Sequence, residues 1–527
     1  MVGAHFLLLP ALLAAPQLSS RPAVQAPDST LRTRVAAWRA GREAAIVREF
    51  ADLLGIPNVA ADSVNIRRNA DAIVRMLERR GVQGRLLEAP GSPPAVYGEL
   101  VSPGATRTVI LYAHYDGQPV DTARWATPPW RPVLRDKSLP EGGREIPFPT
   151  EGGGARSDPE WRIYARSAGD DKASIIAILA ALDALRALGV RPSVNLKFFF
   201  EGEEEAGSEH LRDMLTRHTA LLAADLFLVG DGPVHQTRRP QITFGVRGVM
   251  GLQLTVYGAI RSLHSGHYGN WAPNPNVMLV RLLGSMRDDE GKILIDHFYD
   301  DVRPLTAADR AALATLPPVE DQLLGELRLG RSEGAPALLA EQLLKPAVNF
   351  SGISGGRTGS AASNVIVPEA TAYLDLRLVL DQRPERVREL IENHIRRQGF
   401  FIVRADPDST TRRSHPRILK LLWGEGYPAS RTPLDLPVSR AMVAAARAAL
   451  DQPIITVPAI GGSFGQYVFQ EVLHVPIVGT PIANHDDNQH AENENLRIRN
   501  LWDGIELYAG LLALLGPEWR AAEKPTP

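Results

Sequence analysis

Short apolar runs alternate with amphipathic stretches over the first 240 residues of the chain. Residues 108–113 and 194–200 are mainly apolar and have the length of strands. Residues 63–80 and 170–188 instead repeat apolar side chains every three to four positions, as helices that pack on one face do. Because strands buried on both faces are apolar throughout, this alternation predicts an α/β domain whose sheet carries helices on both faces.

The pattern changes near residue 241. Residues 242–257 alternate apolar and polar side chains, as a strand with one exposed face does. Further strands are expected near 347–351, 365–380 and 401–403, and helices near 275–287 and 384–397. This order of elements predicts a smaller α+β domain inserted into the first one. The predicted divisions are 1–28 (leader and linker), 29–240 (first part of the sheet domain), 241–436 (inserted domain) and 437–527 (second part of the sheet domain).

Two segments fit neither pattern well. Residues 128–161 are rich in Pro, Gly and charge and show no period, so we expect a functional or mobile loop. Residues 303–345 form a charged, helix-prone insertion.

The N-terminus carries an apolar run over residues 6–15 that resembles the core of a signal peptide. The run is too short to span a bilayer, and no later segment looks transmembrane, so we expect no membrane span. Against export, no Lys or Arg precedes the run, and Pro27 follows Ala26. We expect a periplasmic or secreted protein, with a cytoplasmic one as the alternative.

Composition restricts the chemistry. The chain has no cysteine, which excludes disulfides and thiolate ligands, so any metal must bind His, Asp and Glu. The net charge is −2, so no global field favours nucleic acid, and we expect no nucleic-acid partner.

Four carboxylates follow the expected strand 194–200 directly: Glu201, Glu203, Glu204 and Glu205. Like charges beside a buried strand repel one another unless a cation or a proton neutralises them. A solvated acidic turn is one interpretation. The other is a site in which one carboxylate binds a metal and its neighbour acts as a base.

Chemistry-bearing residues also occur at other expected strand ends and loops of the sheet domain: His114, Asp170, Asp231 and His490. Each one alone has a plain structural interpretation, such as a helix cap for Asp170 or a turn for Asp231. Asp116 lies two residues after His114, so both side chains face one side of a strand and the carboxylate can receive the ring N–H. Two histidines and three carboxylates, one of them shared, suffice for two divalent ions that activate water and polarise a carbonyl.

The ordered motifs resemble those of one family. They are His114-Tyr-Asp116-Gly, Asp170-Asp-Lys172, Glu201-Gly-Glu-Glu204-Glu205, Asp231, Leu263-His264-Ser-Gly266 and His490-Ala-Glu-Asn-Glu494. The family is that of the co-catalytic dinuclear zinc metallopeptidases, which contains carnosine-type dipeptidases, glutamate carboxypeptidases, aminoacylase and succinyl-diaminopimelate desuccinylase. The resemblance covers roughly residues 35–516 and lies nearest the dipeptidase branch.

The resemblance implies a fold and a set of roles. The sheet domain would be a catalytic domain, and the inserted domain would be a lid that usually also forms a homodimer. Asp170 would bridge two Zn²⁺ ions (Mn²⁺ or Co²⁺ being possible), His114 and Asp231 would complete one of them, and Glu205 and His490 the other. Glu204 would be the general base and Asp116 would orient His114. His264 would reach the active site of a partner subunit and stabilise the oxyanion.

Three further positions match residues that contact substrate in that family: Arg377, Asn364 and Ser463. Arg377 would grip the free carboxylate, for which a guanidinium fork is suited. The structural alternative is a strand arginine paired with Asp375 or Glu369. Plain alternatives also stand for Asn364, as an edge asparagine, and for Ser463, as part of a tight Gly-Gly-Ser turn.

The function expected is zinc-dependent hydrolysis of a peptide bond in dipeptides or short peptides that have a free C-terminal carboxylate. An N-acyl-amino-acid deacylase using the same two metals is the alternative. A binding protein without turnover is disfavoured because Glu204 is present. We expect Glu201 to be a strand-end carboxylate, Glu203 to be solvated, and His267 and His485 to be supporting or surface residues.

Overall fold

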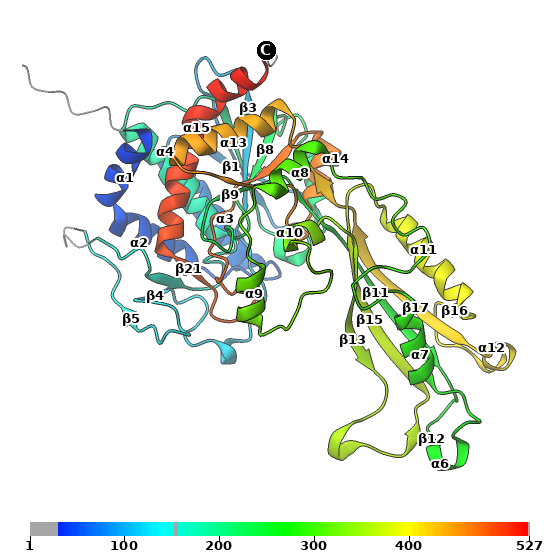
Figure 1. Ribbon diagram of the computed structural model, residues 1–527. Helices are drawn as coiled ribbons and strands as arrows, with labels where there is room; N and C mark the ends of the chain where they lie inside the picture. The colour runs from blue at the N-terminus through cyan, green and yellow to red at the C-terminus, as the bar shows by residue number, and fades with distance from the viewer. Residues whose placement is uncertain (1–29, 152–155, 525–527) are drawn as a thin grey trace, which may run out of the picture.

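An eight-stranded sheet forms the centre of the larger domain, which is named the catalytic domain after the role that the resemblance implies, as the inserted domain is named the lid domain. The computed structural model describes residues 30–151 and 156–524 (Figure 1). The strands run in the order β1 (Gln83–Leu87), β2 (Ala95–Leu100), β7 (Asn195–Glu201), β3 (Thr108–His114), β8 (Leu226–Val229), β20 (Ile477–Gly479), β9 (Gln241–Thr243) and β19 (Ile455–Val457). The central strands β7, β3, β8 and β20 are parallel, so their carboxyl ends meet at one edge of the sheet.

Helices cover both faces of this sheet, which confirms the predicted fold class. Phe198 and Phe200 of β7 point into a core shared with the helices of one face, whereas Phe199 points to the other face. The first face carries α1 (Leu31–Ala40), α2 (Glu43–Leu54), α3 (Ser63–Arg79), α4 (Lys172–Ala187), α13 (Pro437–Leu450) and α15 (Ile498–Ala522). The second carries α5 (Leu211–Arg217) and α14 (Gln466–Leu473), where Phe469 packs on Phe227.

The described residues of the segment 128–161 contain two short strands that the sequence pattern did not predict. They supply β4 (Val133–Arg135) and β5 (Glu145–Ile146) to a four-stranded sheet with β6 (Arg162–Tyr164) and β21 (Asn495–Arg497). Strands of two or three residues are too short to show a period in the sequence, and a functional or mobile role for the segment stays a prediction.

A second sheet forms the lid domain and extends away from the catalytic domain (Figure 1). Its order is β13 (Ala347–Ser354), β15 (Glu369–Leu378), β11 (Gly248–Tyr257), β17 (Ile418–Tyr427) and β16 (Phe401–Val403). One face packs on α7 (Pro275–Gly284) and α11 (Pro384–Arg397), while Gln253 and Tyr373 on the other face are exposed. The short pairs β10 (Gly245–Val246) with β18 (Ser430–Arg431) and β12 (Leu263–His264) with β14 (Val365–Ile366) lie at its two ends. Helices α6 (Ser265–Tyr268) and α12 (Ser409–Ser414) complete the lid domain.

The insertion 303–345 is helical, as predicted, but it leaves the lid sheet. It forms α8 (Ala307–Ala314), α9 (Glu320–Leu327) and α10 (Leu339–Gln342), which Figure 1 shows beside the catalytic domain. Leu313 and Leu344 pack there on Ala459, and Arg431 forms an ion pair with the buried carboxylate of Asp309 at 3.3 Å. The insertion therefore bridges the two domains.

Helix α4 begins later than predicted. Its first residue is Lys172, and Asp171 takes the N-cap position without a side-chain cap bond. Asp170 therefore does not cap the helix, because its carboxylate is bound elsewhere, as described below.

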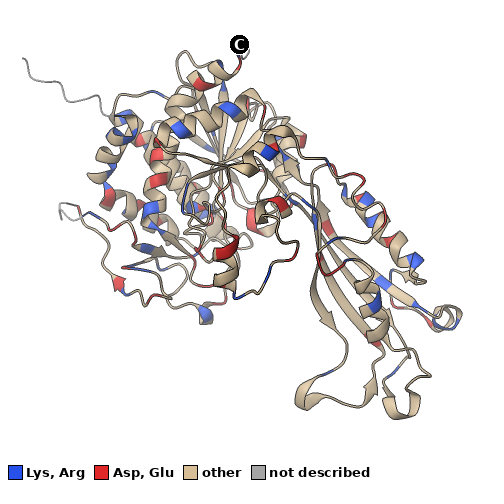
Figure 2. Cartoon of the chain, viewed as in Figure 1, with Lys and Arg blue, Asp and Glu red and all other residues tan. Residues whose placement is uncertain are grey.

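Charged side chains of both signs are interspersed over the two domains (Figure 2). Among the described residues no helix combines the length and hydrophobicity needed to cross a membrane. The expected signal peptide falls outside the described residues, so export stays a prediction.

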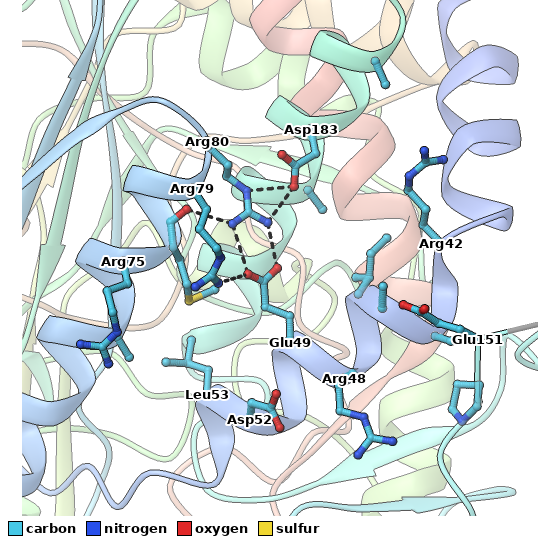
Figure 3. A pocket seen from close by; sticks show the side chains of 18 of the residues that line it. Arg42, Arg48, Glu49, Asp52, Leu53, Arg75, Arg79, Arg80, Glu151 and Asp183 are labelled. Atoms are coloured by element: carbon cyan, nitrogen blue, oxygen red, sulfur yellow. Dashed lines mark hydrogen bonds and ion pairs between the residues drawn. The ribbon is translucent and has the colours of Figure 1, made fainter.

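Arg80 joins three helices in the floor of a hollow of about 1180 Å³ on the outer face of the catalytic domain (Figure 3). Its guanidinium donates to Glu49 of α2 at 2.8 Å, to Asp183 of α4 at 2.9 Å and to the Met76 carbonyl of α3 at 3.0 Å. Burial alone would raise the pKa of Glu49, but Arg80 and Arg79 together lower it. The arginine side chain is only 8% exposed.

Removing this buried cation should destabilise the catalytic domain. We expect Arg80→Ala to lower the free energy of unfolding by about 3 kcal/mol, because Asp183 loses its ion pair and Glu49 keeps only the exposed Arg79 as a partner. Arg79→Ala is the matched control: Arg79 donates to the same Glu49 but is 59% exposed, so its loss should cost below about 1 kcal/mol. Urea unfolding of both variants measures the difference, and equal losses would contradict the role given to Arg80.

Candidate metal centre

Three strand ends at the carboxyl edge of the sheet carry the predicted ligands. His114 is the last residue of β3, Asp231 follows β8, and Glu204 and Glu205 lie in η2 (Glu204–Ala206), just after β7. Because β3 pairs with both β7 and β8, these side chains are brought together by the topology alone.

The carboxylate of Asp170 lies between two histidines. Its Oδ1 is 2.8 Å from Nε2 of His114, and its Oδ2 is 3.2 Å from Nε2 of His490. The same nitrogen of His490 lies 3.2 Å from Glu205 Oε2. Two groups of potential ligand atoms result, namely His114, Asp170 and Asp231, and Asp170, Glu205 and His490, each with all atoms within 4.8 Å of one another. They share Asp170.

Asp116 holds the turn that presents both glutamates. Its Oδ1 accepts the backbone N–H of Glu204 at 3.1 Å, and its Oδ2 accepts that of Glu205 at 2.9 Å. Oδ1 also lies 3.4 Å from Nδ1 of His114. One fully buried carboxylate thus positions a histidine on one strand and an acidic turn on the next.

The cluster is electrostatically strained. Burial, followed by neighbouring carboxylates, raises the pKa of Asp231 to about 7 and that of Glu204 well above its ordinary range. Hydrogen bonds to Asp170 and Glu205 raise the pKa of His490 to about 10. Burial opposes charge on Asp170 as well, but His114 and His490 more than offset it and lower that pKa.

These features fit divalent cations. Oδ1 of Asp231 is buried without a hydrogen-bond partner in the described part of the chain. Carboxylate oxygens and imidazole nitrogens are donors that Zn²⁺, Mn²⁺ and Co²⁺ all accept. A dication beside these side chains would replace the protons that they otherwise hold.

A buried glutamate supports the loop before Asp170. Glu494 accepts the backbone N–H groups of Ser167, Gly169 and Asp170 at 2.9–3.0 Å, and Arg166 at 2.8 Å. The peptide bond between Asp170 and Asp171 is cis. The sequence showed Glu494 only as the end of a motif, and its position four residues after His490 was the available signal.

The prediction for Glu203 is wrong. This side chain is buried, and it accepts the backbone N–H of His210 at 3.1 Å and lies 2.7 Å from its Nδ1. The turn after β7 folds back onto the start of α5, which removes Glu203 from water. Glu201 ends β7 as expected and accepts the hydroxyl of Tyr112 at 2.8 Å. Gly202 between them is required, since a Cβ there would collide with the Tyr115 hydroxyl.

A pocket of about 770 Å³ opens over the ligand cluster. It lies between the domains, because Arg377 comes from β15 of the lid and Ser463 from the catalytic domain. Arg377 donates to Ser463 Oγ at 3.1 Å and to Asp375 at 3.0 Å. Arg247 is a second arginine near this turn. Its backbone N–H donates to the Gly462 carbonyl at 3.0 Å. Burial, together with the charge of Arg377, lowers the pKa of its guanidinium to about 10.

Two predicted residues lie elsewhere. His264 and Asn364 are neighbours at the far end of the lid, where the N–H of Ser265 donates to the Asn364 carbonyl at 2.9 Å (Figure 1). Both side chains are exposed. The single chain therefore does not bring them to its own pocket. His267 is also at this tip, with its ring centroid 4.5 Å from that of His264.

The sequence did not point to the pocket residues His235 and Gln489, and it gave His485 no place in the pocket. Gln489 donates to Asp170 Oδ2 at 2.8 Å. Burial lowers the pKa of both His235 and His485, so their imidazoles are neutral at neutral pH. His485 was expected only as a supporting or surface residue, and its neighbour relation to His490 in the loop was the one signal available.

Known proteins resemble this chain over most of its length. The yeast Candida albicans has a Cys-Gly metallodipeptidase, DUG1, that is 28% identical, with 80% of this chain and 82% of the relative covered. The human Beta-Ala-His dipeptidase is 26% identical, with 87% and 84% covered.

Solved structures show the same fold. An M20 family metallo-carboxypeptidase from Sulfolobus solfataricus superposes with a TM-score of 0.71 at 27% identity, covering 90% of this chain and 99% of that one. Human carnosine dipeptidase 1 gives a TM-score of 0.70 at 22% identity, covering 93% and 100%. The family description Peptidase family M20/M25/M40 matches residues 110–514. The chain belongs to this peptidase family and is a hydrolase of the metallopeptidase class.

Proposed function

We propose that the protein is a two-metal dipeptidase that hydrolyses dipeptides with a free C-terminal carboxylate. The observation that carries the proposal is the pair of ligand groups sharing Asp170, beside which Glu204 stands in neither group. Relatives named as Cys-Gly and Beta-Ala-His dipeptidases support the substrate class.

His114, Asp170 and Asp231 would hold one divalent cation, and Asp170, Glu205 and His490 the second. Zinc is the ion expected, and manganese or cobalt would suit the same donors. When bound, the pair would lower the pKa of a water molecule and polarise the scissile carbonyl.

Glu204 would move the proton. Its carboxylate lies 4.0 Å from Nε2 of His114, lines the pocket and is 14% exposed, so it borders on substrate. It would take a proton from the attacking water and then deliver it to the nitrogen of the breaking peptide bond. Asp116 would act as a positioning residue, since it fixes the turn that carries Glu204.

Arg377 and Ser463 would bind the carboxylate of the substrate. Arg377 and Arg247 are two guanidiniums with one nearby carboxylate, Asp375, so this end of the pocket carries an excess positive charge. A terminal carboxylate would balance it through charge-assisted hydrogen bonds.

His264 and Asn364 would serve the active site of a second copy. Their exposure together at the lid tip, far from the pocket of their own chain, supports a homodimer in which the tip reaches across. His264 would there stabilise the developing oxyanion.

A deacylase acting on N-acyl amino acids remains the second candidate. It would use the same metals and the same carboxylate site, and the leucines that line the pocket would suit an acyl group.

Replacing the base should separate catalysis from metal binding. We expect Glu204→Gln to keep both metals and to lower kcat by at least about 100-fold on a dipeptide such as Leu-Gly. Glu205→Gln is the contrasting neighbour, which should also lose metal. Elemental analysis with steady-state kinetics measures both, and full activity of Glu204→Gln would refute the assignment.

The role of Arg377 can be tested with two substrates that differ only in the C-terminal carboxylate. We expect Arg377→Gln to lower kcat/KM for Leu-Gly by about 10-fold or more, and to leave the C-terminal amide of Leu-Gly unaffected. The exposed Arg383→Gln serves as the control. An equal effect on acid and amide would mean that Arg377 is structural.

Reach across a dimer should appear as complementation. We expect His264→Ala and Glu204→Gln each to be inactive alone, and the two co-expressed chains to recover part of the activity, because a mixed dimer has one intact site. Sizing the purified protein gives its oligomeric state. A fully active monomer would remove the homodimer from the proposal.

A further inference from the structure

Helix α9 of the insertion turns one face toward the pocket. The residues of this segment that line the pocket are Val319, Glu320, Leu323 and Glu326. Leu323 lies four positions after Val319 and three after Glu320, and Glu326 lies three positions after Leu323. Positions three and four apart share one face of a helix, so this is a continuous face. Asp321 and Leu327 are exposed and do not line the pocket. The insertion therefore contributes a wall to the site and is more than a bridge between domains.

Glu320 places a carboxylate on that wall. It accepts the N–H of Leu339 at 2.8 Å and the N–H of Val319 at 3.1 Å, and among the described residues no Lys or Arg forms an ion pair with it. An ionised carboxylate has about four acceptor positions, so capacity remains for another donor. Its charge acts on His235, which also lines the pocket and is neutral, as is His485.

Helix α10 connects Glu320 with the Gly-Gly-Ser turn of the pocket. Leu339, whose N–H is held by Glu320, begins this helix, and Leu343 just after it packs on Gly461 of the Gly-Gly-Ser turn. The turn carries Ser463, which binds Arg377.

We propose that Glu320 receives the free α-ammonium group of the substrate, so that α9 makes the enzyme select unblocked dipeptides over N-acylated compounds. The inference rests on the proposed function, since it assumes that Arg377 holds the carboxylate end. Glu320 as an acceptor for a cation and Arg377 as a donor for an anion then line the same pocket, which matches a zwitterion.

The test compares two substrates that differ only in the ammonium group. We expect Glu320→Gln to lower kcat/KM for Leu-Gly by about 10-fold or more and to leave N-acetyl-Leu-Gly unchanged, because a hydrogen bond to a charged group is lost only for the first. If the wild type turns over the acetylated compound too slowly to measure, its inhibition constant against Leu-Gly is the readout. Asp321→Asn, on the same helix but outside the pocket, should change neither.

A second variant keeps the test decisive if Glu320→Gln unfolds. Leu323→Lys places a cation on the same face, and we expect it to disfavour Leu-Gly relative to N-acetyl-Leu-Gly. Leu327→Lys, whose leucine is 63% exposed, is its control. Thermal unfolding of each variant reports on the fold.

The outcomes separate the two proposals. Equal losses on both substrates would assign Glu320 a structural role and overturn the inference. A wild-type enzyme that prefers N-acetyl-Leu-Gly or N-acyl amino acids would also overturn it. A metal-loaded wild type that cleaves no dipeptide would instead refute the proposed function itself.

Discussion

Mutual repulsion among buried carboxylates is the constraint on which the rest of the structure depends. Asp116, Asp170 and Asp231 converge within a few ångström at the carboxyl edge of the sheet, with Glu204 and Glu205 beside them. Without cations or hydrogen-bond donors nearby, each carboxylate would raise the pKa of the others. Histidines and backbone N–H groups offset this repulsion, and the ligand groups could also hold cations. Asp170, held between two imidazoles, keeps a low pKa, while Asp231 and Glu204 do not.

Backbone N–H groups stabilise the two buried carboxylates that support the site. Both oxygens of Asp116 accept N–H groups of the turn that carries Glu204 and Glu205. Both oxygens of Glu494 accept N–H groups of the loop that carries Asp170. Both carboxylates thus accept backbone N–H groups, which leaves the ligand side chains free to face the centre.

Much of the site could be predicted because its residues sit at strand ends. A buried strand is apolar throughout, so the polar residue that ends it stands out, as His114, Glu204 and Asp231 do. Parallel topology then brings such ends together without further information. Other residues lack this contrast: Glu203 was expected to be solvated because only the packing of α5 buries it, and His235 does not end an apolar strand. His264 and Asn364 were recognised by resemblance, and a single chain holds them away from its own pocket.

The insertion shows why a pattern can reveal elements without revealing their place. Helical spacing over 303–345 predicted helices, but the sequence around them belongs to the lid domain, while Leu313 and Leu344 pack on Ala459 of the catalytic domain. That placement depends on a contact between residues more than one hundred positions apart, which no local period encodes. Its consequence is chemical as well as structural. The pocket is lined by α9 of the insertion, by residues at the edge of the large sheet and by Arg377 of the lid strand β15. The charges of Glu320 and Arg377 therefore enter the pocket from the lid and its insertion, whereas the ligand cluster comes from the sheet.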